Sequence, residues 1–211
     1  MTAPQLRDLS LTEFALRLSE KTPTPGGGSV AAHLASLGAA LGGMAFRFTS
    51  GPKYAAVEGA LAARADALET IRTRAAELVD ADAASYERVM AGYRLPKATE
   101  SEKAARSAAI QAGLAAAIEV PAETLELAAR ALELITGGAA DLNPNVASDC
   151  ASGGWCLRGA AEAAFLNVKI NAASLADKAA AGAWLADCES RLGKVRAAAE
   201  ALNDAIARKL S

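Results

Sequence analysis

One run of helical periodicity constrains the fold of this chain more than any other sequence feature. Apolar side chains recur at intervals of three and four, and alanines fill two gaps: Val57, Leu61, Ala65, Leu68, Ile71, Ala75, Leu78, Tyr86, Val89 and Tyr93. This spacing is typical of a helix with one buried face. The sequence therefore predicts a single helix over residues 53–93, which would be about 60 Å long.

Asp82 lies on the same face, between Leu78 and Tyr86, where a carboxylate is unexpected. A carboxylate in such a position must be paired, hydrogen-bonded or shifted towards its neutral form. These environments suit a general acid or base. The alternative is a structural carboxylate that caps or pairs with a neighbouring helix, and Asp82 alone does not decide between the two interpretations.

The composition favours an all-α fold. Aromatic residues make up 4% of the 211 residues and hydrophobic residues 52%, and alanine accounts for most of the difference. Such a chain favours helices that pack closely through small side chains, and no segment has the pattern of a strand. We expect one domain over residues 1–211, a multihelical bundle of long helices. The 22 basic and 24 acidic residues nearly cancel, and no basic cluster indicates a nucleic-acid partner.

Helix start and stop signals divide the chain into about seven helices. Ser10 with Glu13 and Thr99 with Glu102 form capping boxes, and the first helix ends near Lys21. The other boundaries are predicted at Pro121, at Gly137-Gly138, at Asn143-Pro144, which starts a segment that runs to about Ala173, and at Ser174 with Asp177, which opens the last helix.

Membrane, secretory and metal-binding roles are not expected. The uncharged segment from Val30 to Phe46 is too short and too rich in Ala and Gly for a convincing membrane span. Charged residues near the N-terminus interrupt any signal-peptide core, which predicts a cytoplasmic protein. The single histidine, His33, and the three cysteines, Cys150, Cys156 and Cys188, have no metal-ligand spacing, so we interpret them as packing residues.

Two polar segments stand out as candidate binding elements. The run from Thr22 to Ser29, TPTPGGGS, precedes a helix start whose N–H groups could bind an anion, although such a run is commonly only a turn. It lacks the P-loop pattern, which disfavours a nucleoside triphosphate site. The second segment, Asn143 to Asp149, places Asn145 and Asp149 on one face near a helix start.

Asn167 and Asn171 form a further pair one helical turn apart. Eighteen residues separate Asp149 from Asn167, so an unbroken helix would hold them about 27 Å apart. Either Gly153-Gly154 bends this segment, or the two pairs serve different sites, which a dimer could bring together. The two asparagines could also simply hydrogen-bond between helices.

A homodimer is expected from two features. The 60 Å helix exceeds the diameter of about 43 Å of a compact globule of this length. In addition, the last helix carries a heptad seam that either a partner or the chain itself could cover: Cys188, Leu192, Val195, Ala199, Leu202 and Ile206.

Five segments in order resemble the motifs of the cyclodeaminase/cyclohydrolase family: Thr22 to Ser29, Leu95-Pro96-Lys97, Val120-Pro121, Asn143 to Asp149, and Ala164 to Asn171. That family comprises the C-terminal domain of formiminotransferase-cyclodeaminase and the stand-alone methenyltetrahydrofolate cyclohydrolases. The resemblance covers roughly residues 6–190. It implies an all-helical dimer that acts on a tetrahydrofolate derivative, with no metal and no cofactor beyond the folate substrate.

Within this resemblance, the absence of a formiminotransferase-like region favours a cyclohydrolase, which hydrolyses 5,10-methenyltetrahydrofolate to 10-formyltetrahydrofolate. The alternatives are a formiminotetrahydrofolate cyclodeaminase and a folate-binding dimer without activity. Asp82 is the candidate base and Asp149 the second catalytic carboxylate. A single lysine before Tyr54 departs from the lysine run of many family members, which weakens the expected grip on an anionic tail. The candidate substrate-binding residues are Pro25, Gly26, Gly27, Gly28, Ser29, Lys53, Lys97, Asn145 and Asn167, with the two lysines assigned to the glutamate carboxylates.

Overall fold

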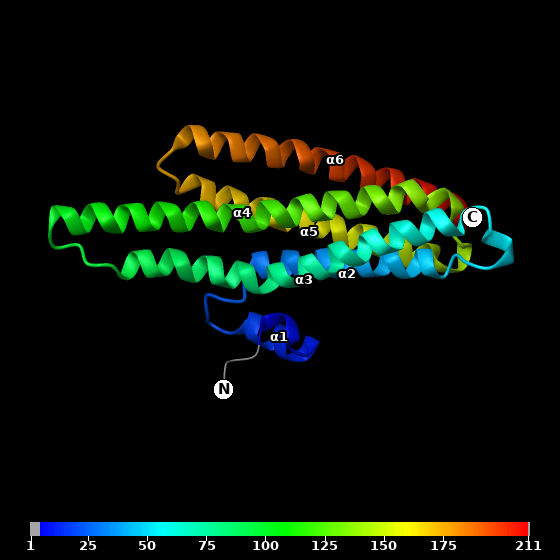
Figure 1. Cartoon of the computed structure of the whole chain (residues 1–211), viewed down its shortest axis with the longest axis horizontal. Coiled ribbons are helices and arrows are strands. Elements are labelled where there is room, and N and C mark those ends of the chain that lie inside the picture. The colour runs from blue at the N-terminus through cyan, green and yellow to red at the C-terminus, as the bar shows by residue number, and fades with distance from the viewer. Residues whose placement is uncertain (1–4, 211) are drawn as a thin grey trace.

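The structure, a computed structural model, describes residues 5–210 as a bundle of long helices with one short helix on its side (Figure 1). Successive long helices run in opposite directions, and residues 5–210 contain no strand, which confirms the all-α prediction. The α-helices are α1 (Leu11–Ser19), α2 (Gly27–Arg47), α3 (Glu58–Arg94), α4 (Glu100–Gly138), α5 (Ala147–Ala173) and α6 (Lys178–Leu210), and the 3-10 helices are η1 (Leu6–Asp8), η2 (Pro52–Tyr54), η3 (Ala139–Asp141) and η4 (Pro144–Val146).

The long predicted helix exists, but it starts later than expected. Gly51 has a φ of 94°, a conformation that favours glycine, and the chain then makes the separate turn η2 before α3 begins at Glu58. With 37 residues, α3 is about 55 Å long. Its end and the start of α4 project beyond the neighbouring helices (Figure 1). The predicted face is buried from Leu61 to Leu78, whereas Tyr86 and Tyr93 are exposed.

Local capping signals are the most accurate of the boundary predictions. Both capping boxes form, at Ser10 with Glu13 and at Thr99 with Glu102. The last helix, however, begins at Lys178, and its cap is Asp177 rather than Ser174, because the Asp177 carboxylate accepts from the N–H groups of residues 179 and 180.

The boundary predicted at Pro121 is wrong, which reduces the predicted seven helices to six α-helices in residues 5–210. α4 runs through Pro121 without a break. A proline inside a helix leaves the carbonyl four residues earlier without its N–H donor, and that carbonyl belongs to Ala117. Asn171 on α5 supplies the missing donor, with its Nδ2 atom 2.8 Å from the Ala117 oxygen.

The heptad seam of α6 is covered by the chain itself, so it does not support a dimer. Each of its six residues is at most 4% exposed. A side chain at Gly154 of α5 would meet Leu202 at 2.5 Å, which shows how closely the two helices pack. The prediction that a partner chain covers this seam is therefore wrong.

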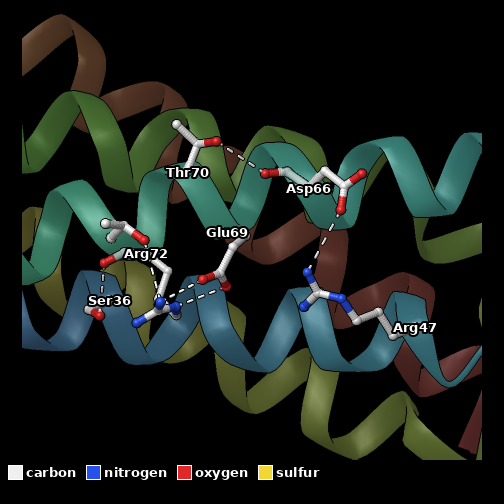
Figure 2. Close-up of polar contacts among 7 residues, drawn as sticks. Ser36, Arg47, Asp66, Glu69, Thr70 and Arg72 are labelled. Carbon is white, nitrogen blue, oxygen red and sulfur yellow. Dashed lines mark hydrogen bonds and ion pairs between the residues drawn. The ribbon is translucent and has the colours of Figure 1, made fainter.

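α2 packs against α3, α4 and α5, and small residues let it approach its neighbours closely. A side chain at Gly38 would lie 2.8 Å from the Gly153 carbonyl of α5. Towards α3, the Ser36 hydroxyl donates to the Arg72 carbonyl at 3.1 Å and Arg47 pairs with Asp66 at 3.9 Å (Figure 2). α2 is the one helix within residues 5–210 that is long and apolar enough to cross a membrane. Because 61% of its apolar window is buried inside the bundle, it has the character of a core helix.

Candidate functional site

A cavity of about 340 Å³ opens where the start of α2 meets α3, α4 and the second half of α5. Its volume lies at the lower end of the range usual for ligand sites. The lining residues are Pro23, Thr24, Gly26, Gly27, Gly28, Asp82, Ser85, Tyr86, Val89, Ala117, Asn167, Ile170, Asn171 and Ser174. Five of the predicted site residues therefore line the same cavity. Two more, Pro25 and Ser29, are direct sequence neighbours of these lining residues.

The glycine run allows α2 to begin directly against the Asp82 carboxylate. An added side-chain carbon at Gly28 would lie 2.0 Å from Asp82 Oδ1, a distance at which no side chain fits. The Ser29 hydroxyl donates to Asp82 Oδ2 at 2.9 Å. The N-cap residue Gly26 has no capping side chain of its own, so Asp82 supplies an acceptor from α3 at the positive end of α2.

The charge state of Asp82 is set mainly by the loss of water. Burial raises the pKa of this carboxyl above its ordinary value, and the hydrogen bonds from the Ser29 side chain and backbone partly oppose that rise. No neighbouring charge contributes to the shift, and Asp82 has no ion-pair partner among residues 5–210. Asp82 therefore caps α2 and also faces the cavity as a carboxylate with raised basicity.

Two amides from α5 form the opposite wall of the cavity. Asn167 donates its Nδ2 to the Ala163 carbonyl at 2.9 Å, and an added side chain at Gly27 would lie 3.4 Å from that nitrogen. Asn171 donates to the Ala117 carbonyl across the helix interface. The start of α2 and the α5 amides therefore lie close together, although about 140 residues separate them in sequence.

Three predicted site residues lie at the other end of the bundle. α5 is unbroken from Ala147 to Ala173, so Gly153-Gly154 does not bend it and Asp149 stays about 27 Å from Asn167. Asn143 links this end to the turn after α2, because its backbone N–H donates to the Thr49 hydroxyl at 3.0 Å. Asn145 and the exposed Lys53 lie at this same end. One chain therefore does not bring Asp149, Asn145 or Lys53 to Asp82.

Lys97 lies beside the Asp82 cavity but outside it. It lines a separate hollow of about 390 Å³ with Lys103, Arg106 and Gln111. The Gln111 side chain connects the two hollows, since its Oε1 accepts from the Ala176 N–H at 2.7 Å and its Nε2 donates to the carbonyl of Ser174, which lines the Asp82 cavity.

A larger hollow lies elsewhere, between α4 and α6. It measures about 600 Å³ and is lined by surface charges that include Arg130, Glu133 and Lys194. Arg191 on its wall pairs with Glu126 at 3.2 Å. This groove contains none of the residues predicted for the site, whereas the smaller Asp82 cavity contains five of them.

The remaining candidate groups play no part in this cavity. His33 is partly buried against Phe14, with the ring centroids 5.4 Å apart, and burial lowers its pKa. Cys150 and Cys188 are buried and Cys156 is partly buried, and burial raises the pKa of all three thiols. Within residues 5–210, no group of three or more His, Cys, Asp or Glu side chains could hold a metal ion.

Sequence comparison places these features in a known context. Residues 10–190 match the profile of the formiminotransferase-cyclodeaminase family, including every segment that forms the cavity. The chain belongs to this family. A methenyltetrahydrofolate cyclohydrolase of Methylorubrum extorquens is 34% identical over 203 residues, which cover 96% of this chain and 98% of that protein.

Other family members are longer or more distant. The formimidoyltransferase-cyclodeaminases of Rattus norvegicus and Gallus gallus are each 31% identical, over 82% and 80% of this chain. The chain spans only about a third of their length, 32% and 31%. The crystal structure of a formiminotetrahydrofolate cyclodeaminase from Thermotoga maritima has a TM-score of 0.86 at 24% identity, and the match covers 96% of this chain and 98% of that one. It shows that the bundle has the fold of that structure.

Sequence reasoning missed several lining residues that helical spacing could have found. Ser85 and Tyr86 lie three and four residues after Asp82, so they share its helical face and line the same cavity. Asn171, one turn after Asn167 on α5, also lines the cavity. Ala117 and Ser174 carry no chemical signal in the sequence, and only the packing of α4 and α5 brings them here.

We predict that Ser29→Ala raises the pKa of Asp82, because the variant removes a hydrogen bond that favours the carboxylate and leaves the burial unchanged. The pKa can be followed by NMR of the carboxyl carbon. Ser36→Ala is the matched control, because Ser36 is a buried serine of the same helix that donates to a backbone carbonyl instead.

The same shift has a stability consequence. A carboxyl whose pKa is raised on folding binds its proton more tightly in the folded chain, so the free energy of unfolding decreases as pH rises from the unfolded to the folded pKa. Ser29→Ala should extend this decrease to higher pH. An unchanged Asp82 pKa in Ser29→Ala would contradict the assigned hydrogen bond.

Proposed function

We propose that this chain is a methenyltetrahydrofolate cyclohydrolase, which hydrolyses 5,10-methenyltetrahydrofolate to 10-formyltetrahydrofolate in one-carbon metabolism. The observation that carries the proposal is the Asp82 carboxylate, which faces the cavity with a raised pKa and without a cationic partner. The methenyl group of the substrate is part of a delocalised amidinium cation, which is the counter-charge that this carboxylate lacks. The Methylorubrum relative, matched over 98% of its length, supports the same reaction.

The proposed mechanism uses Asp82 as a base and then as an acid. Water attacks the bridging carbon. Asp82 takes one proton from this water and stabilises the positive charge that develops on the water oxygen. The tetrahedral intermediate then collapses to the formyl carbonyl as the bond between this carbon and N5 breaks. Protonated Asp82 returns its proton to N5, and the hydroxyl proton of the intermediate leaves to solvent. The reaction needs no cofactor beyond the folate substrate.

The loop from Pro25 to Ser29 and the amide of Asn167 would hold the ring system in place. The first turn of α2 approaches the cavity without side chains at Gly26, Gly27 and Gly28, so a flat ring can lie against its backbone. Asn167 faces the same space from α5. These residues therefore orient the substrate towards Asp82 rather than take part in bond breaking.

A second candidate activity is formiminotetrahydrofolate cyclodeamination, because relatives with 31% identity are formimidoyltransferase-cyclodeaminases. In that reaction N10 would attack the formimino carbon, and Asp82 would help protonate the departing ammonia. The near-complete match to the cyclohydrolase favours hydrolysis.

We also propose that Lys97 contacts the glutamate tail of the folate. Lys97, Lys103 and Arg106 line the hollow next to the Asp82 cavity, and the Gln111–Ser174 contact joins the two. A tail that leaves the cavity along α4 would meet these positive charges. Lys53 lies at the opposite end of its own chain, so it can serve the tail only from a partner subunit.

The proposed unit is a homodimer joined through an apolar face of α2 and α5. On α2, the outer positions follow a spacing of four and three and carry no charge: Val30, Leu34, Leu37, Leu41, Met44 and Phe48. On α5, Trp155, Leu166 and Ile170 are 50%, 64% and 70% exposed. The two rows adjoin, since an added side chain at Gly159 of α5 would lie 3.8 Å from Leu34. Exposed large apolar side chains in one continuous face mark an interaction surface.

An antiparallel twofold arrangement would complete the site. The α2 row is centred between Leu37 and Leu41, so a twofold axis there sets Phe48 of the partner subunit beside Val30. Asp149 of the partner subunit, Asn145 of the partner subunit and Lys53 of the partner subunit would then approach the Asp82 cavity. Asp149 would act on the pterin or, in place of Asp82, on the leaving ring nitrogen. Asn145 would orient the ring, and Lys53 would contact the tail.

We further propose that the enzyme works in the cytoplasm. The three cysteines are free thiols, and two of them are buried. Unpaired cysteines suit a reducing compartment. The proposed folate substrate is also a soluble metabolite.

We predict that Asp82→Asn lowers turnover by at least about 100-fold, the usual scale for loss of a general base, while the helical content is retained. The assay follows the near-ultraviolet absorbance of methenyltetrahydrofolate, which hydrolysis bleaches. Formiminotetrahydrofolate is run in parallel with an ammonia assay. Near-normal turnover in Asp82→Asn would show that Asp82 is only a helix cap. A wild-type protein that binds the folate without bleaching it would be a binding protein and not an enzyme.

Lys97→Ala should raise the KM for a polyglutamylated folate more than for the monoglutamate, and added salt should reduce the difference, because the lost contact is electrostatic. Lys194→Ala is the matched control, since Lys194 is a surface lysine in the groove between α4 and α6. Equal KM changes for the two substrates would remove Lys97 from the tail site.

Mixing two inactive variants tests the shared site. If Asp82 and Asp149 act together across the dimer, a mixed dimer of Asp82→Asn and Asp149→Asn has one intact site in two. Half of the re-assorted dimers are mixed, so equal amounts should recover about a quarter of wild-type activity.

The control mixture combines Asp82→Asn with Asn167→Leu, which fall in the same site of the same chain. This mixture should recover nothing. No recovery with Asp149→Asn, after subunit exchange has been verified by light scattering and mass spectrometry, would contradict the antiparallel dimer.

A further inference from the structure

Pro121 creates a gap in the hydrogen bonding of α4 that opens directly onto the cavity. Proline has no N–H, so the carbonyl of Ala117, four residues earlier, has no donor from its own helix. Ala117 lines the Asp82 cavity. The Asn171 side chain of α5 donates to this carbonyl at 2.8 Å, and α4 continues through the proline.

This contact determines which way the Asn171 amide faces. A backbone carbonyl accepts only from the amide nitrogen, so Nδ2 must point to α4 and Oδ1 must point away from it. Asn171 lines the cavity, and its Oδ1 therefore belongs to the cavity side. Asn167, one turn earlier, is oriented in the same way by the Ala163 carbonyl. Each amide therefore donates from its Nδ2 to a backbone carbonyl, and its Oδ1 remains available as an acceptor.

We propose that Asn171 is a specificity-determining residue whose Oδ1 accepts a hydrogen bond from the N–H edge of the bound ring, and that Pro121 is the residue that positions it. This inference rests on the proposed folate reaction. A reduced 2-amino-4-oxopteridine carries N–H donors on its 2-amino group, N3 and N8, which match acceptors on the α5 wall. A ring with acceptors at these places would leave the asparagine oxygen unpaired and would bind more weakly.

The positioning depends on a residue that weakens a helix by itself. With alanine at position 121, the new N–H would compete with Asn171 for the Ala117 carbonyl, and the contact that orients Asn171 would weaken. The helix would gain stability while the site lost order. If Pro121 were purely structural, its replacement by alanine would not raise the stability of the helix and weaken substrate binding at the same time.

The test compares Pro121→Ala, Asn171→Leu and the double variant in the bleaching assay and in thermal unfolding. Pro121→Ala should keep or raise the melting temperature and change kcat little, but raise the KM for methenyltetrahydrofolate by about tenfold, the scale of one neutral hydrogen bond. Asn171→Leu should raise KM at least as much. In the double variant KM should not exceed that of Asn171→Leu, because both changes remove the same contact.

Thr124→Val is the matched control. Thr124 is buried in the next turn of α4 and donates its hydroxyl to the Val120 carbonyl, away from the cavity. Its KM should stay at the wild-type value. As a readout besides activity, exchange of the Asn171 side-chain amide protons with solvent, measured by NMR, should be slow in the wild type and fast in Pro121→Ala.

Two failures can be told apart. An active wild type whose KM is unchanged by Pro121→Ala or by Asn171→Leu would overturn the role of Asn171 and leave the proposed reaction in place. A wild type that neither bleaches nor binds methenyltetrahydrofolate would overturn both.

Discussion

The contact between the first turn of α2 and the Asp82 carboxylate is the interaction on which the site depends. Because Gly28 has no side chain, α3 passes close enough for Asp82 to meet the uncapped start of α2. The same closeness removes water from the carboxylate and raises its pKa. Charge at a helix start usually stabilises the ionised form, yet here desolvation exceeds that effect. One helix crossing therefore builds both a cap and a candidate base.

The small residues of the bundle explain why its polar chemistry lies near the helix ends. Around Gly38 and Gly42, α2 approaches Gly153 and Ile135 so closely that no further side chain fits. Such packing leaves no room for a cavity between these helices at that level. The Asp82 cavity lies instead where α2 begins, and Asp82, Asn167 and Asn171 line it. The alanine and glycine content that predicted the fold class also determines where a ligand can bind.

The parts that could be predicted from the sequence are those whose cause is local. Both capping boxes form because each needs only residues three positions apart. Pro121 was misjudged because the residue that compensates for it, Asn171, is 50 positions away and reaches it only through the packing of α4 on α5. The α6 heptad correctly identified a buried face, but a spacing does not reveal which helix covers that face. Asp82 was found because a carboxylate on an apolar face has few physical explanations.

The separation of the polar residues into two groups follows from the length of α5 and has a structural consequence. An unbroken helix from Ala147 to Ala173 holds Asp149 and Asn167 about 27 Å apart, and no side chain spans that distance. The apolar face that joins the two ends lies on α2 and α5, and α5 carries Asp149 near one end and Asn167 near the other. A twofold copy of this face, turned end to end, would bring opposite ends together, whereas a parallel copy would keep them apart. If both groups serve one reaction, the antiparallel arrangement is therefore the one that a symmetric pair can use.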